Sequence, residues 1–214
     1  MAEYKEVIGT AVQTVAGDPD NPVKGQLWYN STTAEFRYQE QAYGSAWSSV
    51  APVNTGRALP GGAGTQTAAI VFTGEGTANT ELFDGSSWTE VNNVNTARQI
   101  FQGNAGTQTS ALGFGGYDGT NPVTVTESWD GTNWTEVNDM NTARFNIAGF
   151  GADSTSALGS GGIASTGRVG VTESWNGTSW TEVNDLNTSR GQAGGAGIAT
   201  AGLVFGGENP GTAF

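Results

Sequence analysis

The strongest constraint on the fold of this chain is an internal repeat with a period of 46 residues. Three stretches are close copies of one another, namely TELFDGSSWTEVNNVNTAR at 80–98, TESWDGTNWTEVNDMNTAR at 126–144 and TESWNGTSWTEVNDLNTSR at 172–190. In each copy a glutamate stands seven positions before a central tryptophan, and an arginine stands ten positions after it. A repeat of this length indicates an array of similar small units that bury one another's apolar faces.

Three residue types mark the repeat. They are the tryptophans Trp47, Trp88, Trp134 and Trp180, the arginines Arg57, Arg98, Arg144 and Arg190, and the glutamates Glu81, Glu127 and Glu173. Trp47 and Arg57 belong to a fainter fourth copy, which also keeps Glu40 seven residues before the tryptophan. Each of these four arginines ends an Asn-Thr-x-Arg sequence.

These repeated residues are expected to form the scaffold. An arginine that recurs with a glutamate predicts an ion pair between units, and a tryptophan in constant register predicts packing between them. The functional alternatives are a ring of arginines that binds anions, tryptophans that stack on sugars, and glutamates that hydrolyse glycosides. The scaffold interpretation is favoured because a catalytic pair breaks the symmetry of a repeat.

Each unit is expected to contain four short strands. A segment rich in glycine and alanine follows the arginine, and an apolar run such as SALGFGG at 110–116 comes next. Two alternating stretches then flank an Asp-Gly or Asn-Gly turn, for example at 130–131. Alternation, β-branched residues and such turns favour strands, and no helical periodicity is present.

Four-stranded units of this length favour a β-propeller. The repeat also resembles that of kelch-type propellers, in which a Gly-Gly pair is followed by a glutamate, an aromatic-Asp pair, a tryptophan and a Met-x-x-x-Arg ending. The matching residues are Gly115, Gly116, Glu127, Trp129, Asp130, Trp134, Met140 and Arg144. The resemblance covers residues 36–214 and departs from the family at Gly74 and Gly76, and in having four units rather than six or seven.

The sequence therefore predicts an all-β chain with an arm or tether at 1–24 and a propeller of four blades, each of four antiparallel strands, at 25–214. The chain starts with the second half of a unit and ends with the first half. Strands from about 191–206 are thus expected to pair with strands from about 36–51, so that a mixed blade closes the ring. The alternatives are an open half-ring completed by a second chain and a piece of a longer array. An additional strand is expected at 26–30.

Composition excludes much chemistry. The 214 residues include no cysteine and no histidine, which removes thiolate nucleophiles, cysteine-bound zinc and the commonest general base. We therefore expect no enzyme activity, no cofactor and no metal. A formal net charge of −12 argues against nucleic-acid binding. No apolar run approaches 18 residues and the first residues are acidic, so neither a membrane span nor a signal peptide is expected.

Binding is expected where the units differ. The arginine-to-glutamate distance is 24 residues in the first unit and 29 in the next two, so the loops between the second and third strands vary. These loops and both chain ends are expected on one face of a propeller, where loops carry function. The candidate binding residues on this face are Tyr117, Asp118, Asn121, Arg168, Glu208 and Asn209.

The segment GDPDNPVKGQLWYNSTTAEFRY at 17–38, with its GQLWYN core at 25–30, resembles a stretch near the start of bacteriophage virion and tail-appendage proteins. The resemblance implies a non-enzymatic structural or adhesive module of a virion, made in the host cytoplasm, with other virion proteins or a host-surface receptor or glycan as partners. A homo-oligomer is left open. The alternatives are an extracellular carbohydrate-binding lectin and a glycosidase whose carboxylates break the repeat, such as Asp118 or Asp153.

Overall fold

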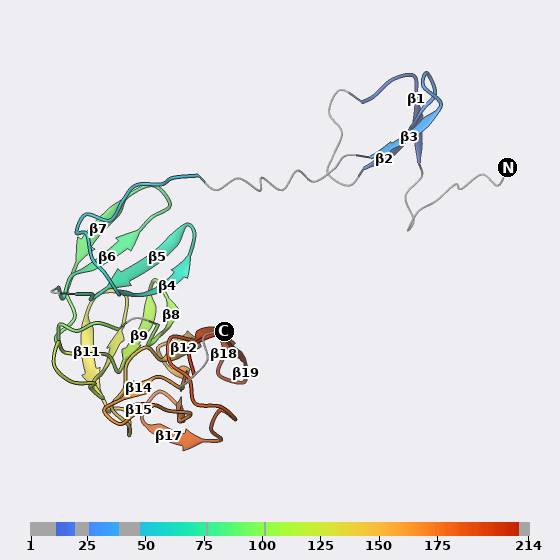
Figure 1. The fold of residues 1–214 in the computed structure, drawn as a ribbon. Coiled ribbons are helices and arrows are strands. Elements are labelled where there is room, and N and C mark those ends of the chain that lie inside the picture. The colour runs from blue at the N-terminus through green and yellow to red at the C-terminus, as the bar shows by residue number, and fades with distance from the viewer. Residues whose placement is uncertain (1–11, 20–25, 39–47, 76, 101, 210–214) are drawn as a thin grey trace. The chain divides into compact units, whose positions relative to one another are not determined.

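The computed structural model describes residues 12–19, 26–38, 48–75, 77–100 and 102–209, and these residues form strands and no helix (Figure 1). The predicted all-β class is therefore confirmed. By its internal contacts the chain divides into two compact units, residues 1–49 and 50–214. A separate arm at 1–24 stays a prediction.

The first unit contains a three-stranded sheet. Its strands, in spatial order, are β1 (Gln13–Val15), β2 (Leu27–Asn30) and β3 (Glu35–Tyr38), with β1 parallel to β2 and β3 antiparallel to it. The additional strand expected at 26–30 is β2. Trp28 and Asn30 are buried, and both donate side-chain hydrogen bonds to one oxygen of Asp18, at 3.1 Å and 3.0 Å. Arg37 pairs with the other oxygen at 2.7 Å, so Asp18 holds this sheet face together.

The second unit contains three four-stranded antiparallel sheets, which agrees with the strand content predicted for the repeat. The first sheet is β4 (Gly61–Thr65), β5 (Ala68–Phe72), β6 (Thr80–Phe83) and β7 (Trp88–Val91). The second sheet is β8 (Asn104–Thr107), β9 (Ser110–Phe114), β10 (Thr126–Trp129) and β11 (Trp134–Val137). The third sheet is β12 (Ala148–Asp153), β13 (Ser156–Ser160), β16 (Thr172–Trp175) and β17 (Trp180–Val183).

Two shorter pairs complete this unit. The hairpin of β14 (Ile163–Ala164) and β15 (Gly167–Arg168) lies in the connection between β13 and β16. The last pair is β18 (Gly194–Ile198) and β19 (Ala201–Phe205), which stands as a two-stranded sheet among the residues that the structure describes. Residues 39–47, which include Trp47 and most of the strands expected to complete this pair, lie outside the described residues.

The turn between the last two strands of a unit is fixed by its Asp-Gly or Asn-Gly sequence. One oxygen of Asp130 accepts the main-chain N–H groups of Thr132 and Asn133, at 2.8 Å and 2.7 Å. Gly131 has a φ of 96°, in the left-handed region that glycine adopts without strain. The turn thereby sets the register that places Trp129 opposite Trp134.

The first strands of successive sheets lie side by side, with β4 next to β8, β8 next to β12 and β12 next to β18. Glycine permits this approach. A Cβ atom on Gly149 would lie 2.4 Å from the carbonyl oxygen of Gln102 and 2.6 Å from the main-chain nitrogen of Asn104. The glycine-rich first segment of each repeat therefore allows close backbone contact.

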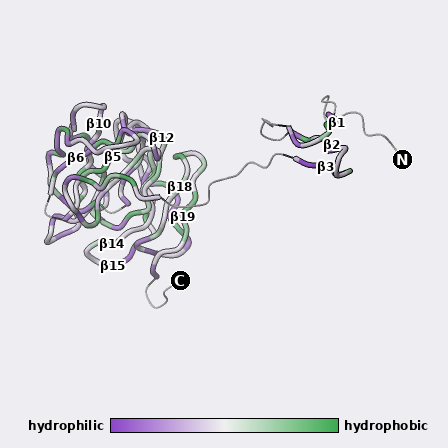
Figure 2. Tube along the Cα trace, turned by 90° about the horizontal axis from the view of Figure 1, so that it is seen from above, coloured by the Kyte–Doolittle hydropathy of each residue, from purple (hydrophilic) through white to green (hydrophobic). Residues whose placement is uncertain are grey.

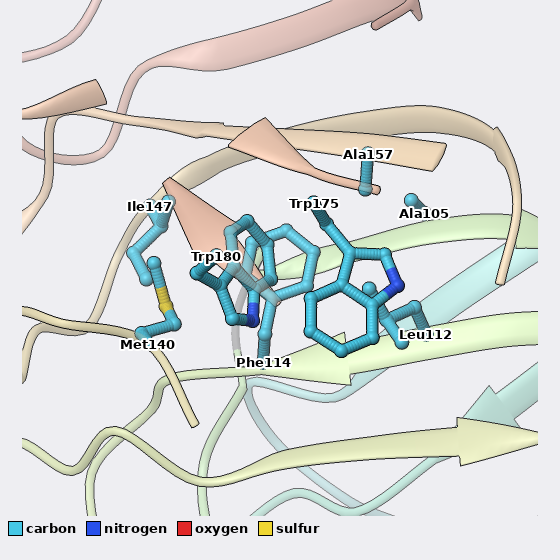
Figure 3. Close-up of a cluster of buried hydrophobic side chains, with 8 residues drawn as sticks. All are labelled: Ala105, Leu112, Phe114, Met140, Ile147, Ala157, Trp175 and Trp180. Carbon is cyan, nitrogen blue, oxygen red and sulfur yellow. The ribbon is translucent and has the colours of Figure 1, made fainter. Parts of the chain in front are cut away.

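The apolar core lies between adjacent sheets rather than within one. Figure 3 shows one cluster, which draws residues from the second sheet, the third sheet and the segment that joins them, and consists of Ala105, Leu112, Phe114, Met140, Ile147, Ala157, Trp175 and Trp180. A matching cluster joins the first and second sheets around Phe72 and Trp134. In Figure 2 apolar stretches also run along β18 and β19, where Leu203 and Phe205 are 63% and 52% exposed.

Candidate functional site

The Asn-Thr-x-Arg segment that leaves one sheet encloses the glutamate of the next. Oε2 of Glu127 accepts the main-chain N–H and the side-chain amide of Asn95, at 2.7 Å and 2.9 Å. Oε1 accepts the main-chain N–H of Thr96 at 3.2 Å and Nη1 of Arg98 at 2.5 Å. We call the Asn, Thr and Arg donors of one motif a carboxylate cradle. Both oxygens of the glutamate are thus used by protein donors.

The same arrangement recurs in the neighbouring units. Around Glu173 the main-chain nitrogens of Asn141 and Thr142 donate at 2.7 Å and 3.2 Å. The guanidinium of Arg144 donates at 3.2 Å. Around Glu81 the donors are Asn54, Thr55 and Arg57. The predicted pairing of arginine with glutamate is therefore present in three units, and it crosses from the connecting segment to the third strand of the following sheet.

Burial and the neighbouring charges act in opposite directions on the pKa values of Glu81 and Arg98. Burial opposes ionisation of Glu81, but the N–H groups of Asn54 and Thr55 and the guanidinium of Arg57 outweigh it, and the pKa of Glu81 lies below its usual value. Burial lowers the pKa of Arg98, and Glu127 partly offsets this effect. An arginine remains charged in such a site. Glu81, Glu127 and Glu173 are each 0% exposed, so their carboxylates are closed to solvent in this structure.

Two repeat tryptophans tie each sheet to the preceding one. Nε1 of Trp180 donates to Oγ1 of Thr126 at 3.0 Å, and its ring lies 4.8 Å from that of Phe114 (Figure 3). Trp134 makes the matching contacts with the first sheet, to Thr80 at 2.9 Å and to Phe72 at 4.6 Å. Both rings are buried, so they are closed to sugar stacking.

Trp88 differs from these two. It is half-buried, and Nε1 donates to the carbonyl oxygen of Ala51 at 3.0 Å. Its ring packs on Phe83 in the neighbouring strand of the same sheet, at 5.0 Å between centroids. Trp88 therefore lacks the aromatic partner from a preceding sheet that its two counterparts have, among the residues described.

The candidate binding residues lie at the ends of the second strands. Tyr117, Asp118 and Asn121 lie between β9 and β10, Arg168 lies in β15, and Glu208 and Asn209 follow β19. Tyr117 exchanges two main-chain hydrogen bonds of 2.9 Å with Gln99. Its ring lies 5.1 Å from that of Phe145, which follows the next repeat arginine.

The chain of contacts that begins at Tyr117 continues into the following units. Phe145 and Ile163 exchange main-chain hydrogen bonds of 3.0 Å and 2.8 Å, and Ile163 pairs with Arg168 across the β14–β15 hairpin. Arg168 forms an ion pair with Glu208. Phe145 and Ile163 thus connect three candidate residues, Tyr117, Arg168 and Glu208, into one continuous surface. We call this surface the variable face, and it consists of Gln99, Tyr117, Phe145, Ile163, Arg168 and Glu208.

Sequence reasoning missed Gln99, Phe145 and Ile163. Each stands directly after a repeat arginine or directly after a Gly-Gly pair, and these two positions form a main-chain pair in the second and third units. The same positions are occupied by Gly191 and Glu208 at the end of the chain. The signal that could have found them is variation between two constant motifs.

The remaining candidates have local roles. Asp118 caps its own loop by accepting the N–H groups of Asn121 and Thr120, each at 2.7 Å, and these bonds lower its pKa. Asn121 is exposed and Asn209 is half-buried. The pKa of Asp153 is lowered by the hydroxyl and the N–H group of Thr155.

The two acids that break the repeat cannot act as a pair. Asp118 follows the end of β9, whereas Ser154, next to Asp153, hydrogen-bonds to Ser110 at the start of that strand. The two carboxylates therefore lie at opposite ends of the sheets. Among the described residues, no group of three or more acidic side chains could hold a metal ion.

No known protein family matches this chain, and no curated protein matches it. Within the described ranges, no helix is long and apolar enough to cross a membrane.

Proposed function

We propose that the chain is a non-enzymatic structural or adhesive module of a bacteriophage virion, carried on a tail or capsid appendage, and that the variable face contacts a host-surface receptor, a glycan or another virion protein. The observation that carries this proposal is the contrast between the cradles and the variable face. The donors around Glu127 and Glu173 are the same, while the residues beside them change from Gln99 and Tyr117 to Phe145 and Ile163. A constant frame with changing surface residues is suited to recognition.

We also propose that the second unit is a four-bladed, kelch-like propeller whose fourth blade is mixed. Supporting this, β18 and β19 have the sequence and pairing of the first two strands of a unit. Leu203 and Phe205 are exposed, whereas their counterparts Leu112 and Phe114 are buried against residues of the following sheet, such as Trp175 and Trp180. Two further strands from residues 36–51 would complete the fourth blade, and a closed ring would place the first sheet against these side chains and leave only short edges.

The absence of catalytic activity is part of the proposal. The glutamates of the repeat are enclosed by protein donors, and the chain has no histidine or cysteine. The proposal of a virion location is supported by the first unit, because its β2 and β3 lie in the segment that resembles phage appendage proteins.

The test is quantitative mass spectrometry of virions purified through a density gradient. The proposal predicts that the chain co-purifies with the particles at a fixed copy number relative to a major structural protein. A chain that remains in the soluble fraction of the lysate, or whose ratio to the structural protein falls with each purification step, would overturn the virion assignment.

A lectin is the second candidate, and the Tyr117–Phe145 pair favours it. The two half-buried rings lie 5.1 Å apart on the variable face, where an apolar sugar surface could pack on them. Binding on a glycan array that is lost in Tyr117→Ala would support this candidate. An array with no bound glycan would leave a protein receptor as the partner.

A further inference from the structure

One turn of the repeat carries asparagine where its two counterparts carry aspartate. The turns of the first and second sheets contain Asp84-Gly85 and Asp130-Gly131, whereas the turn between β16 and β17 contains Asn176-Gly177. No other Asn-Gly pair occurs in the sequence. Asn176 and Gly177 are both exposed, so water reaches the side-chain amide and the main-chain nitrogen that follows it.

The turn holds the amide oxygen of Asn176 with two donors. Oδ1 accepts the main-chain N–H groups of Thr178 and Ser179, each at 2.9 Å. In the second sheet Oδ1 of Asp130 accepts the N–H groups of the two equivalent positions, at 2.8 Å and 2.7 Å. The glycines that follow the two residues have φ values of 90° and 96°. The carboxamide is therefore held in the place that a carboxylate occupies in the preceding unit.

These two donors stabilise negative charge on the oxygen that accepts them. The N–H groups of Asn133 and Thr132 hold the pKa of Asp130 below its usual value. In the third sheet the same donors face an uncharged amide oxygen. That oxygen gains negative charge when a nucleophile adds to the amide carbon, and N–H groups already in place stabilise the charge as it develops.

The main-chain nitrogen of Gly177 can close a five-membered ring on Cγ of Asn176, because Cβ, Cα and the carbonyl carbon of Asn176 complete the ring. A glycine has no Cβ atom to obstruct this approach. Among the described residues, neither the N–H group of Gly177 nor Nδ2 of Asn176 makes a hydrogen bond. The attacking nitrogen and the leaving nitrogen are thus held by no other described group.

We propose that Asn176 is a site of self-catalysed deamidation with water as the co-reactant. The nitrogen of Gly177 forms a bond to Cγ of Asn176, the Cγ–Nδ2 bond breaks, and Nδ2 leaves as ammonia with the proton that the attacking nitrogen gives up. One water molecule then opens the cyclic imide. Addition of water at Cγ gives aspartate, and addition at the main-chain carbonyl carbon gives isoaspartate. Asp84 and Asp130 have no amide to lose, so the third turn is the one that changes.

The two products have different consequences for the fold. Aspartate restores the residue type that the other turns contain. Isoaspartate adds a carbon atom to the main chain between Trp175 and Trp180, which lie opposite each other in the register of β16 and β17. It also displaces Thr178, whose carbonyl oxygen accepts Nδ2 of Asn138 from the end of the second sheet at 2.8 Å. The isoaspartate form therefore has a weaker junction between the second and third sheets.

The test is peptide mapping of the purified full-length chain. The chain is kept in mildly alkaline buffer, and samples are digested with trypsin at intervals. Cleavage after Arg168 and Arg190 gives the peptide 169–190, which contains Asn176 together with Asn184 and Asn187 as internal controls. Tandem mass spectrometry locates the modified residue. The same peptide, incubated free in solution, has the Asn-Gly pair without the turn.

We expect Asn176 in the folded chain to be converted at least as fast as in the free peptide, while Asn184 and Asn187 stay unchanged. Slower conversion in the folded chain would show that the turn protects the amide, and equal conversion of the three asparagines would show that the turn has no selectivity. Either result overturns the inference.

A second measurement tests the effect on the junction. The products are separated by anion exchange, and their thermal melts are compared with that of Asn176→Asp, which contains aspartate alone. The isoaspartate form should melt at a lower temperature, and Asn176→Asp should melt with the unmodified chain. An isoaspartate form as stable as Asn176→Asp would contradict the weakened junction. Both measurements use purified protein, and they concern the frame of the molecule rather than the variable face.

Discussion

Arg98 and Glu127 form a buried ion pair that joins the segment leaving one sheet to the third strand of the next. Neither side chain is exposed to solvent, and the pair is supported by main-chain N–H groups on the carboxylate and carbonyl oxygens on the guanidinium. A buried pair of this kind contributes little if both partners are replaced together, but removal of one partner leaves an uncompensated charge. The cradles are therefore the points at which the array of sheets is most easily broken.

Glu127→Gln should destabilise the second unit by about 3–5 kcal/mol, because it leaves Arg98 buried without its counter-ion. Glu136→Gln is the matched control, since Glu136 lies opposite Glu127 in the β10–β11 register but is exposed. Urea unfolding followed by tryptophan fluorescence measures both. Equal midpoints for the two variants would contradict the structural role of the pair.

Stability should fall in acid and stay flat near neutral pH. The pKa of Glu81 is below its usual value in the folded chain, so its contribution is present above the unfolded pKa and is lost as pH falls through the folded one. No histidine titrates between pH 6 and 8. Urea midpoints measured across pH should therefore be level around neutrality and drop below about pH 4.

Glu81→Gln should reduce that acid dependence, because the variant carries no carboxylate at this position to protonate. A variant whose stability falls with acid as steeply as that of the unmodified chain would show that other carboxylates control the transition.

Trp180→Ala should cost about 3–5 kcal/mol, because it opens a cavity between the second and third sheets and removes the bond to Thr126. Trp88→Ala should cost clearly less, since Trp88 is half-buried and packs within its own sheet. Thermal melts of the two variants make the comparison. A larger loss for Trp88 would contradict the packing between sheets described for Trp180.

Gly149→Ala should destabilise by about 2 kcal/mol or more, because the added methyl group would overlap main-chain atoms of the adjacent first strand. Gly56→Ala is the control. A Cβ atom at Gly56 meets nothing within 4 Å, and its φ is outside the left-handed region. The control is expected to be neutral or slightly stabilising, since alanine lowers the entropy of the unfolded chain. Thermal melts followed by circular dichroism measure the stability of both variants.

Much of the fold could be predicted because the same sequence pattern occurs in three copies. The Asp-Gly turn at 130–131 and the alternation around Trp134 are local signals, and the structure has strands at these places. The pairing of Arg98 with Glu127 was also visible, since the two residues recur together.

Other features depend on backbone conformation or on pairing between distant segments. The main-chain N–H groups of Asn95 and Thr96 bind Glu127 only because the segment turns there, and no side chain in the sequence predicts that turn. The parallel pairing of β1 with β2 and the contact of Tyr117 with Phe145 join segments outside the periodic pattern. Neither could be found by searching for a period.

Adhesion through the variable face is tested most directly by competition. Purified chain is added to host cells before the phage, and the rate of phage adsorption is measured for the unmodified chain, for the variant with Tyr117→Ala and Arg168→Ala, and for Gln66→Ala. Gln66 is exposed in the turn between β4 and β5, at the other end of a sheet. We expect the unmodified chain and Gln66→Ala to slow adsorption equally, and the double variant to need about tenfold more protein for the same effect. A double variant that competes as well as the unmodified chain, or an unmodified chain that does not compete, would contradict this expectation.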